Sequence, residues 1–430
     1  MKKVLLFSYS GFSDENANGI TMKNLLSAFV PEEKAEFYCD VQPPDYTAAH
    51  HYFRVTDTQM LKAFFGKKTR RVFEFDSNAS GGQNAPQTAK SVGSPKRIPV
   101  WLKKYKYNFA LKWLREHLWR LSPWGHRRLK EWIREFAPDA IVYMVGESIF
   151  MDKLVLRTCN DLNVPLVLYN GEAYRIIDLD KRHGLERAYY RRVEKLYETL
   201  HDRAELVIYN CEMLKNDYEA MYTAKSKAII AYNSAACSHT PYRPGESVTI
   251  TYFGNLGVGR SDTLLQVARI LGRIDPELRL YIYGNAMPEA AQRFHETDNI
   301  RYHGFVNAEQ LHEIVERSDI LLHVESFDDQ IIPKLKYAFS TKIAQCLCAG
   351  RCFVSFAPTG TASSQYLRSA EGALLVSEET ELEALLRKLV ENPTLRQEYA
   401  QKAAATGLKN HRMETTAQWV RQEIEGLRHG

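Results

Sequence analysis

The chain has 430 residues, of which 45% are hydrophobic and 25% are charged, as in soluble globular proteins. This length exceeds that of one ordinary α/β core and predicts two domains. The net charge of +5 is too small for a general nucleic-acid binder, and no apolar run reaches the roughly 18 residues that span a bilayer. Seven irregularly spaced cysteines without paired histidines predict reduced thiols in a cytoplasmic protein, and no zinc site.

Strands and helices alternate along the first half of the chain. The first predicted strand, at residues 3–9, is followed by a polar loop and by helical spacing at residues 20–29. A helix that begins after such a loop offers its N-terminus to an anion. Further apolar segments predict strands at residues 35–41, 139–146, 165–171, 204–210 and 227–233. Together these segments predict one doubly wound sheet with helices on both faces.

A basic, tryptophan-rich segment lies between the second and third of these strands. Residues 96–135 carry twelve Lys or Arg and three Glu, which leaves the rest of the chain slightly acidic. Residues 101–136 hold five of the six Trp. Because Trp and basic residues prefer membrane interfaces, this composition is consistent with contact with a membrane surface or a lipid-linked acceptor. A helix pair packed on the domain with its charges in solvent fits the composition equally well, and nucleic-acid binding is the weakest alternative.

A second alternation begins after residues 234–247, a segment with Pro and Gly and no periodicity that predicts a linker. Short apolar strands occur within residues 250–260, 278–286, 300–311 and 319–327, with a helix and a strand in 339–356. Ligands of parallel sheets bind at the carboxyl ends of the strands. The polar residues at those ends are Asn255, Arg260, Asn285, Glu325, Ser340, Thr341 and Lys342. Their amides, hydroxyls and cations suit a nucleotide-diphosphate ligand.

The order of these motifs resembles the GT-B glycosyltransferases, and the second half resembles glycosyltransferase family 4. The motifs are YFGNLGVGR, YIYGN, HGFV and SDILLHVES, and after them a helix of the form STK-I-x-x-x-L-x-x-G-R. The resemblance implies two Rossmann-like, doubly wound domains facing a central cleft, at residues 1–235 and 236–410. It also implies that a C-terminal helix, within residues 411–430, returns to the N-terminal domain.

The resemblance also implies where a nucleotide-sugar donor would bind. In this family cations and free N–H groups hold the donor diphosphate, because negative charge grows on the leaving phosphate. Arg260 and Lys342 are the expected cations, Ser340 and Thr341 add hydroxyls at a helix N-terminus, and Gly19 lies near the phosphates. The alternatives are that Arg260 is a surface cation, that the aliphatic part of the Lys342 side chain only packs against its neighbours, and that Gly19 belongs to an ordinary helix cap.

The chain departs from the family pattern at its paired glutamates. The family commonly has two glutamates seven residues apart near the donor sugar and ribose. Here Glu325 ends its strand in the expected region, while Gln345 occupies the second position, after the inserted sequence DDQIIPKLKYAF. Glutamine still accepts a hydrogen bond from a ribose hydroxyl but carries no charge. The alternative for Glu325 is an exposed loop carboxylate.

Two glutamates follow strands of the first half and are candidates for the acceptor side. Glu147 and Glu172 could orient an acceptor hydroxyl or act as its base. A glutamate that only stabilises a helix N-terminus is the alternative, and it fits Glu147 better than Glu172. In retaining members of the family no protein nucleophile is expected, because the leaving phosphate itself assists deprotonation.

The resemblance therefore implies a retaining hexosyltransferase that moves a sugar from a UDP-linked or other nucleotide-diphosphate donor to a hydroxyl of a glycan or lipid-linked oligosaccharide. Surface polysaccharide assembly is the expected setting, in the cytoplasm or at the inner face of the membrane. Neither a cofactor nor a metal is expected, because the adjacent Asp328 and Asp329 do not form an Asp-x-Asp triplet.

Three other functions stay open at this point. A nucleotide-dependent oxidoreductase is disfavoured because the glycines of residues 254–260 do not follow the dinucleotide fingerprint. A sugar-nucleotide epimerase on the same fold needs paired acid and base carboxylates, which the sequence does not clearly offer. A catalytically silent scaffold subunit gains support from the uncharged Gln345.

Overall fold

The computed structural model describes residues 2–67, 72–74, 108–222, 226–238, 240–245 and 247–427. Residues 96–107 of the basic segment and Trp101 lie outside these ranges. The chain forms two compact units. Unit 1 comprises residues 1–210, 214–231 and 417–430, and unit 2 comprises residues 211–213 and 232–416. None of the described helices is both long and apolar enough to cross a membrane.

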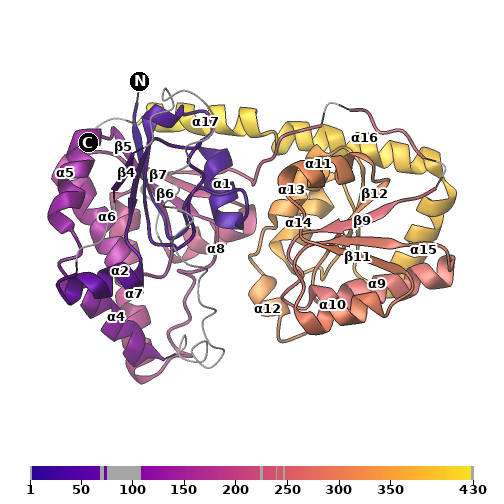
Figure 1. The fold of residues 1–430 in the computed structure, drawn as a ribbon, viewed down its shortest axis with the longest axis horizontal. Coiled ribbons are helices and arrows are strands. Elements are labelled where there is room, and N and C mark those ends of the chain that lie inside the picture. The colour runs from indigo at the N-terminus through magenta and orange to yellow at the C-terminus, as the bar shows by residue number, and fades with distance from the viewer. Residues whose placement is uncertain are drawn as a thin grey trace. The chain divides into compact units, whose positions relative to one another are not determined.

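Unit 1 is built on an eight-stranded sheet of order β4-β3-β2-β1-β5-β6-β7-β8, parallel except for β4. Figure 1 labels β4, β5, β6 and β7 of this sheet. Its central strand pairs Val4 with Lys34 on one side and with Ala140 on the other. The strands are β1 (Val4–Phe7), β2 (Lys34–Tyr38), β3 (His51–Arg54), β4 (Val72–Glu74), β5 (Ala140–Met144), β6 (Leu166–Asn170), β7 (Leu206–Tyr209) and β8 (Lys227–Ile230). The chain thus reverses its direction of growth at β1, which makes the β1/β5 edge the switch point of this sheet.

Helices on both faces of this sheet bury its apolar side chains. They are α1 (Ala17–Leu25), the 3-10 turn η1 (Pro31–Glu33), α2 (Asp57–Phe64), α4 (Phe109–Leu121), α5 (His126–Phe136), α6 (Ile149–Leu162), α7 (Gly184–Arg203) and α8 (Glu212–Met221). The last helix, α17 (Met413–Glu425), joins them: Val420 and Ile424 are fully buried in the core of unit 1, and Arg421 pairs with Glu33 at 2.8 Å. The predicted return of the C-terminal helix is confirmed.

Unit 2 contains a six-stranded parallel sheet of order β11-β10-β9-β12-β13-β14. The strands are β9 (Ile250–Phe253), β10 (Leu280–Tyr283), β11 (Ile300–Gly304), β12 (Ile320–Val324), β13 (Cys352–Phe356) and β14 (Leu374–Val376). The helices are α9 (Arg260–Ile274), α10 (Pro288–His295), α11 (Ala308–Glu316), α12 (Ile332–Leu335), α13 (Thr341–Cys348), α14 (Ala362–Ala370), α15 (Glu379–Glu391) and α16 (Pro393–Asn410). The switch point lies between β9 and β12, so their carboxyl ends are the expected ligand edge.

Candidate functional site

Three glycines let the backbone close tightly at the carboxyl edge of the second sheet. Gly254 and Gly284 end β9 and β10 with φ of +112° and +150°, and a Cβ atom on Gly284 would lie 2.0 Å from the carbonyl oxygen of Gly254. Gly259, with φ of +75°, precedes α9, and a Cβ atom there would lie 2.3 Å from Oγ of Ser326. Any larger residue would push these segments apart, so the sequence pattern YFGNLGVGR has a packing reason. The turn brings the first residue of α9, Arg260, over the end of β12.

Arg260 and Glu325 form a buried ion pair at this edge. Nη2 of Arg260 lies 2.9 and 2.8 Å from the two carboxylate oxygens of Glu325, and the side chains are 12% and 4% exposed. Burial acts to raise the pKa of Glu325, but His323 and the charge of Arg260 outweigh it and lower the pKa to about 2. Burial lowers the pKa of His323, so its ring is uncharged at neutral pH and Arg260 supplies the compensating charge.

This pair excludes two of the alternatives raised by the sequence. Arg260 is not a free surface cation, and Glu325 is not an exposed loop carboxylate. The pairing also means that the positive charge of Arg260 is largely balanced before any ligand arrives. Oε2 of Glu325 lies 2.8 Å from Nη2 of Arg260, and Nε2 of His323 lies 3.3 Å from Oε1 of Glu325. Among the described residues, Nε of Arg260 is the atom of this cluster that is buried without a hydrogen-bond partner. Such an atom usually signals a missing partner such as a ligand or water.

Lys342 is the one cation of this edge without a carboxylate partner in the described chain. Its ammonium donates a hydrogen bond to the hydroxyl of Tyr252 at 2.7 Å and lies 4.5 Å from the centre of that ring. Its methylene stem passes the end of β9, since a Cβ atom on Gly254 would lie 2.9 Å from its Cδ. Burial, followed by the charge of Arg260, lowers the pKa of Lys342 to about 7. A buried ammonium in this state is costly unless an anion binds nearby.

Tyr252 was not singled out by the sequence. Its hydroxyl accepts the hydrogen bond from Lys342 and donates one to the carbonyl oxygen of Asn255 at 2.6 Å. The tyrosine therefore connects the lysine to the loop after β9. Its position in the motif ITYFGN, as an inward-facing strand residue three positions before Asn255, is ordinary for a core tyrosine, and only the structure reveals its partner.

The N-terminus of α13 adds backbone donors to this edge. Ser340 occupies the N-cap position, and its side chain makes no capping hydrogen bond. The N–H of Ile343 donates to the carbonyl oxygen of Ser340 at 3.1 Å, while the N–H groups of Thr341 and Lys342 have no such partner among the described residues and are available to an anion. Thr341 and Gln345 are half-buried on the same helix as Lys342. This agrees with the predicted placement of hydroxyls and N–H groups beside the lysine.

The two predicted asparagines close loops at the same edge and are exposed. Oδ1 of Asn255 accepts a hydrogen bond from the N–H of Gly257 at 2.7 Å, which shapes the turn before α9. Asn285 follows Gly284, whose carbonyl oxygen accepts a hydrogen bond from the hydroxyl of Tyr302 at 2.9 Å. Both amides are positioned by their loops and reach solvent, so they are open to a ligand.

Comparisons with known proteins bear on the fold. HepE of Anabaena in complex with UDP aligns with a TM-score of 0.65 and 12% identity over 99% of this chain and 100% of HepE. Sucrose-phosphate synthase of Thermosynechococcus elongatus gives 0.61 and 11% over 99% and 98%. WaaG, a glycosyltransferase involved in lipopolysaccharide biosynthesis, gives 0.56 and 12% over 99% and 100%. The chain has the GT-B fold.

The sequence comparison matches a shorter part of the chain than the structural comparisons do. Residues 260–422 match the family described as glycosyl transferase-like, a stretch that contains Arg260, Glu325 and Lys342. No curated protein matches the chain. The predicted resemblance to GT-B glycosyltransferases is thus confirmed, and the family match falls on the half of the chain in which the motifs were recognised.

Unit 1 of the GT-B fold contains the remaining predicted site residues. Gly19 is the third residue of α1, and its N–H donates to Oδ1 of the N-cap residue Asn16 at 2.7 Å. A Cβ atom on Gly19 would lie 2.5 Å from the carbonyl oxygen of Gly11, so the glycine permits a close crossing of loop and helix. The predicted helix at residues 20–29 starts earlier, at Ala17, because Asn16 caps it.

The two acceptor-side candidates differ in their surroundings. Glu147 forms an ion pair with Lys112 at 3.2 Å, which gives it a structural partner. The side chain of Glu172 is exposed, although its contact with the protein removes enough water to raise its pKa. The hydroxyl of Tyr218 holds the backbone of Glu172 by donating to its carbonyl oxygen at 2.9 Å. Glu172 is therefore the freer carboxylate of the two.

The described part of the basic segment forms α4 and α5, which pack on the rest of unit 1. Trp119, Trp124 and Trp132 are each 1% exposed, and Trp119 stacks on Phe150 with ring centres 3.9 Å apart. These three indoles belong to the core, as in the packing alternative. A cavity of about 320 Å³ opens beside them, and its basic side chains without a carboxylate partner in the described residues are Arg120, Lys153, Arg157 and Arg192.

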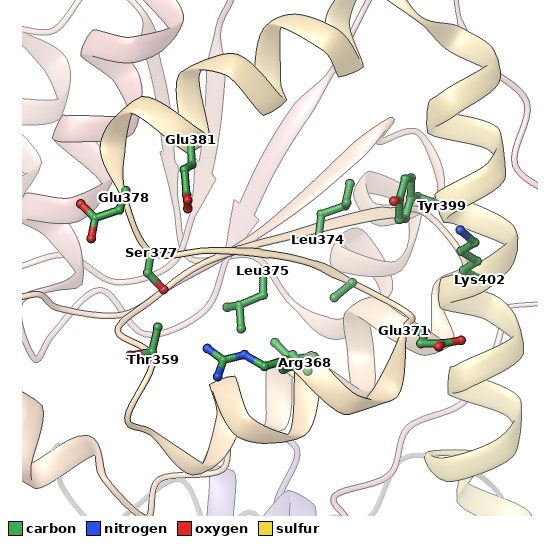
Figure 2. Close-up of a pocket in the computed structure, with 12 residues that line it drawn as sticks. Thr359, Arg368, Glu371, Leu374, Leu375, Ser377, Glu378, Glu381, Tyr399 and Lys402 are labelled. Atoms are coloured by element: carbon green, nitrogen blue, oxygen red, sulfur yellow. The ribbon is translucent and has the colours of Figure 1, made fainter.

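A separate cavity of about 730 Å³ lies beside the edge strand β14, between side chains of α14, α15 and α16 (Figure 2). Arg368, Glu381 and Lys402 are among the residues around it. None of the predicted donor-site residues lines this cavity, so the ligand edge at β9, β12 and α13 is a different place.

Proposed function

We propose that this protein is a retaining, metal-independent glycosyltransferase of family 4. It transfers a hexose from a UDP-linked sugar to a hydroxyl of a glycan or lipid-linked oligosaccharide in surface polysaccharide synthesis. The observation that carries the proposal is the buried Lys342, a cation at the switch point of the second sheet that has no carboxylate partner among the described residues. Relatives of the same fold support the donor class, since HepE has been solved with UDP, with UDP and glucose, and with UDP-glucose.

The chemistry follows from the charges at this edge. A nucleoside diphosphate brings negative charge close to Lys342, which raises the pKa of the lysine and keeps it protonated. The uncapped N-terminus of α13 and the half-buried Thr341 add hydrogen bonds to the phosphate oxygens. As the sugar–phosphate bond breaks, charge accumulates on the leaving phosphate, and these fixed donors stabilise it more than they stabilise the intact donor.

Glu325 and Arg260 have a positioning role in this proposal. The pKa of about 2 keeps Glu325 ionised, so it accepts hydrogen bonds from sugar hydroxyls and does not donate a proton. Arg260 holds the carboxylate and offers its unpartnered Nε toward the donor. Gln345 and the exposed Asn255 and Asn285 contact the nucleoside and sugar hydroxyls, Gly19 adjoins the phosphates, and Glu172 orients the acceptor hydroxyl.

The acceptor carries phosphate groups in this proposal. Arg120, Lys153, Arg157 and Arg192 line a cavity that three Trp side chains also line, and none of the four forms an ion pair with a described carboxylate. Glu116 also lines this cavity, so one carboxylate faces four cations. Their mutual repulsion, after burial, contributes to lowering the pKa of Lys153. A phosphate of a lipid-linked acceptor, or an anionic membrane surface, would relieve it.

A thermal-shift screen against UDP, GDP, ADP and NAD tests the proposal. A ligand at about 100 times its dissociation constant stabilises the folded state by about 2.7 kcal/mol. We expect UDP to raise the melting temperature and NAD to have no effect. A shift with NAD alone would contradict the proposal.

A catalytically silent GT-B subunit is the second candidate, because Glu325 neutralises Arg260 and Gln345 is uncharged. Such a subunit would bind UDP yet release no UDP from any UDP-sugar. A time course of UDP release from UDP-sugars, with and without oligosaccharide acceptors, separates the two functions. The epimerase alternative lacks support in the described part of unit 2, where Glu325 is held ionised and has no acidic carboxyl beside it.

A further inference from the structure

Two cysteines far apart in the sequence meet at one end of α13. Sγ of Cys237 lies 2.8 Å from Sγ of Cys348, the last residue of that helix. The S–S bond of a disulfide is about 2.05 Å long, so the two sulfurs need a movement of less than 1 Å to bond. This pairing could not be predicted from the sequence, because 111 residues separate the two positions.

The backbone around both sulfurs is held in place. The N–H of Ser238 donates to the carbonyl oxygen of Cys348 at 2.8 Å, directly beside the pair. Ala235 bonds in both directions to the segment before α17, through His411 at 2.9 Å and Met413 at 3.0 Å. The segment that enters unit 2 at Tyr232 is thus fastened against α13, so the thiols keep their approach without help from a ligand.

The two thiols have different reactivities. Cys237 is partly exposed, and the hydrogen bond from Cys348 lowers its pKa. The pKa of Cys348 is raised by this hydrogen bond and by burial. Because the thiolate is the nucleophile, Cys237 reacts first and Cys348 is the resolving thiol. Cys346 provides a contrast on the same helix, since it is buried and burial raises its pKa to about 12.

We propose that Cys237 and Cys348 are a site of reversible disulfide formation when a hydroperoxide oxidises the protein. The thiolate of Cys237 attacks the hydroperoxide oxygen, which yields a sulfenic acid and releases an alcohol, or water where the oxidant is hydrogen peroxide. The thiol of Cys348 then attacks the sulfenic sulfur, loses its proton and displaces water. The two thiols lose two electrons in total, and the hydroperoxide gains them.

The bond would connect the segment at residues 232–238 to the C-terminal end of α13. The other end of this helix carries Ser340 and Lys342. Oxidation would therefore fix α13 to the segment through which the chain enters unit 2, and a dithiol reductant would release it. This inference concerns the thiols alone and does not depend on the proposed transferase activity.

The test counts thiols in the denatured full-length chain after treatment with hydrogen peroxide. We expect the count to fall from the seven of the sequence to five, and peptide mapping to find one cross-link between Cys237 and Cys348. Dithiothreitol should restore all seven. The variant C237S should lose the cross-link, while C346S, the matched control, should keep it.

Two results would overturn the proposal. The first is a wild-type chain that retains all seven thiols under conditions that oxidise free cysteine. The second is a cross-link that persists in C237S or joins other cysteines. Because Cys237 is partly exposed, C237S is expected to fold, and its unchanged melting temperature under reducing conditions verifies this.

Discussion

Both units bury an arginine–carboxylate pair near the carboxyl edge of their sheet, and the two pairs differ in charge balance and access. In unit 1, Nη2 of Arg175 lies 2.8 Å from Oδ1 of Asp152, and both side chains are 0% exposed. Tyr143 donates to the same carboxylate at 2.8 Å, and the ring of Tyr197 lies 5.5 Å from the guanidinium. This pair is neutral and closed to solvent, although Oδ2 of Asp152 and Nε of Arg175 also lack a hydrogen-bond partner among the described residues.

In unit 2, the pair of Arg260 and Glu325 is 12% and 4% exposed and has a third charge beside it, that of Lys342. The cluster therefore carries an excess positive charge at a partly open edge. An arginine paired with a carboxylate therefore does not identify a ligand-binding site by itself. What distinguishes a binding edge from a structural pair is the cation left over after pairing and its access to solvent.

The largest expected effect is on the closed pair. Asp152→Asn leaves the buried Arg175 without a counter-charge, and we expect the free energy of unfolding of unit 1 to fall by about 3–5 kcal/mol. The five Trp among the described residues all lie in unit 1, so tryptophan fluorescence in a urea titration reports on this unit. Asp178→Asn is the control, because Asp178 pairs with Lys181 on the surface, where solvent screens the charges, and its loss should have a much smaller effect. Equal stability of the two variants would show that the buried pair contributes no more to stability than the surface pair.

The next largest loss of stability is expected from substituting a glycine at the carboxyl edge of the sheet in unit 2. Gly284→Ala places a Cβ atom 2.0 Å from the carbonyl oxygen of Gly254 at a φ of +150°. We expect a loss of about 2–4 kcal/mol from strain and overpacking. Gly304→Ala has a positive φ of +73° with open space around it, so it should cost about 1 kcal/mol. Circular dichroism against temperature measures both, and a cost for Gly284→Ala no larger than that for Gly304→Ala would contradict the close approach.

Substitution of Lys342 should raise the free energy of unfolding, whereas substitution of Asp152 should lower it. Lys342→Met keeps the stem and removes the buried ammonium, so we expect the free protein to gain about 1–3 kcal/mol. The folded-state pKa of about 7 lies below the value of 10.5 in the unfolded chain, so the unfolded state binds more protons between these values. Wild-type stability relative to the variant should therefore rise as pH increases from 7 toward 10.5. A difference that does not change with pH would show that the lysine is not desolvated.

The smallest effects are expected at the cavity beside α4. Lys153→Gln and Arg157→Gln should each weaken binding to anionic lipid vesicles by about 1 kcal/mol, since each removes a basic charge without a carboxylate partner. Arg127→Gln is the control, because Arg127 pairs with Glu131 at 2.9 Å away from the cavity. Co-sedimentation with phosphatidylglycerol vesicles measures the change. Identical binding by all three variants would remove this cavity from the acceptor proposal.

Much of the fold could be predicted from the sequence, because strands with glycine or polar ends recur with helices between them. Neither β3 nor α2 was predicted from the sequence. The strand β3 has only four residues, and its two aromatic residues lie between His51 and Arg54. The site residues after the strands could also be nominated, because the carboxyl edge of a parallel sheet is known in advance. The pairing of Arg260 with Glu325 could not, because it joins residues 65 apart through a loop whose shape depends on three glycines.

The same reasoning explains why Lys342 was nominated without its partner. The motif STK places it on the first turn of a helix, but its contact with Tyr252 spans 90 residues and depends on the packing of α13 against β9. The sequence also offered no means to separate Trp119, Trp124 and Trp132, which are core residues, from indoles at a membrane interface. Burial is a tertiary property, and composition alone does not determine it.

The most direct test of the account is the affinity of UDP for the wild type and for Lys342→Met, measured by calorimetry between pH 6.5 and 9. The wild type should bind UDP more weakly as pH rises, because binding requires the protonated lysine and its pKa in the free protein is about 7. The variant should bind at least about 10-fold more weakly at pH 6.5 and show no such decline. Equal affinity of the two proteins, with the same pH profile, would contradict the assignment of Lys342 as the phosphate-binding cation.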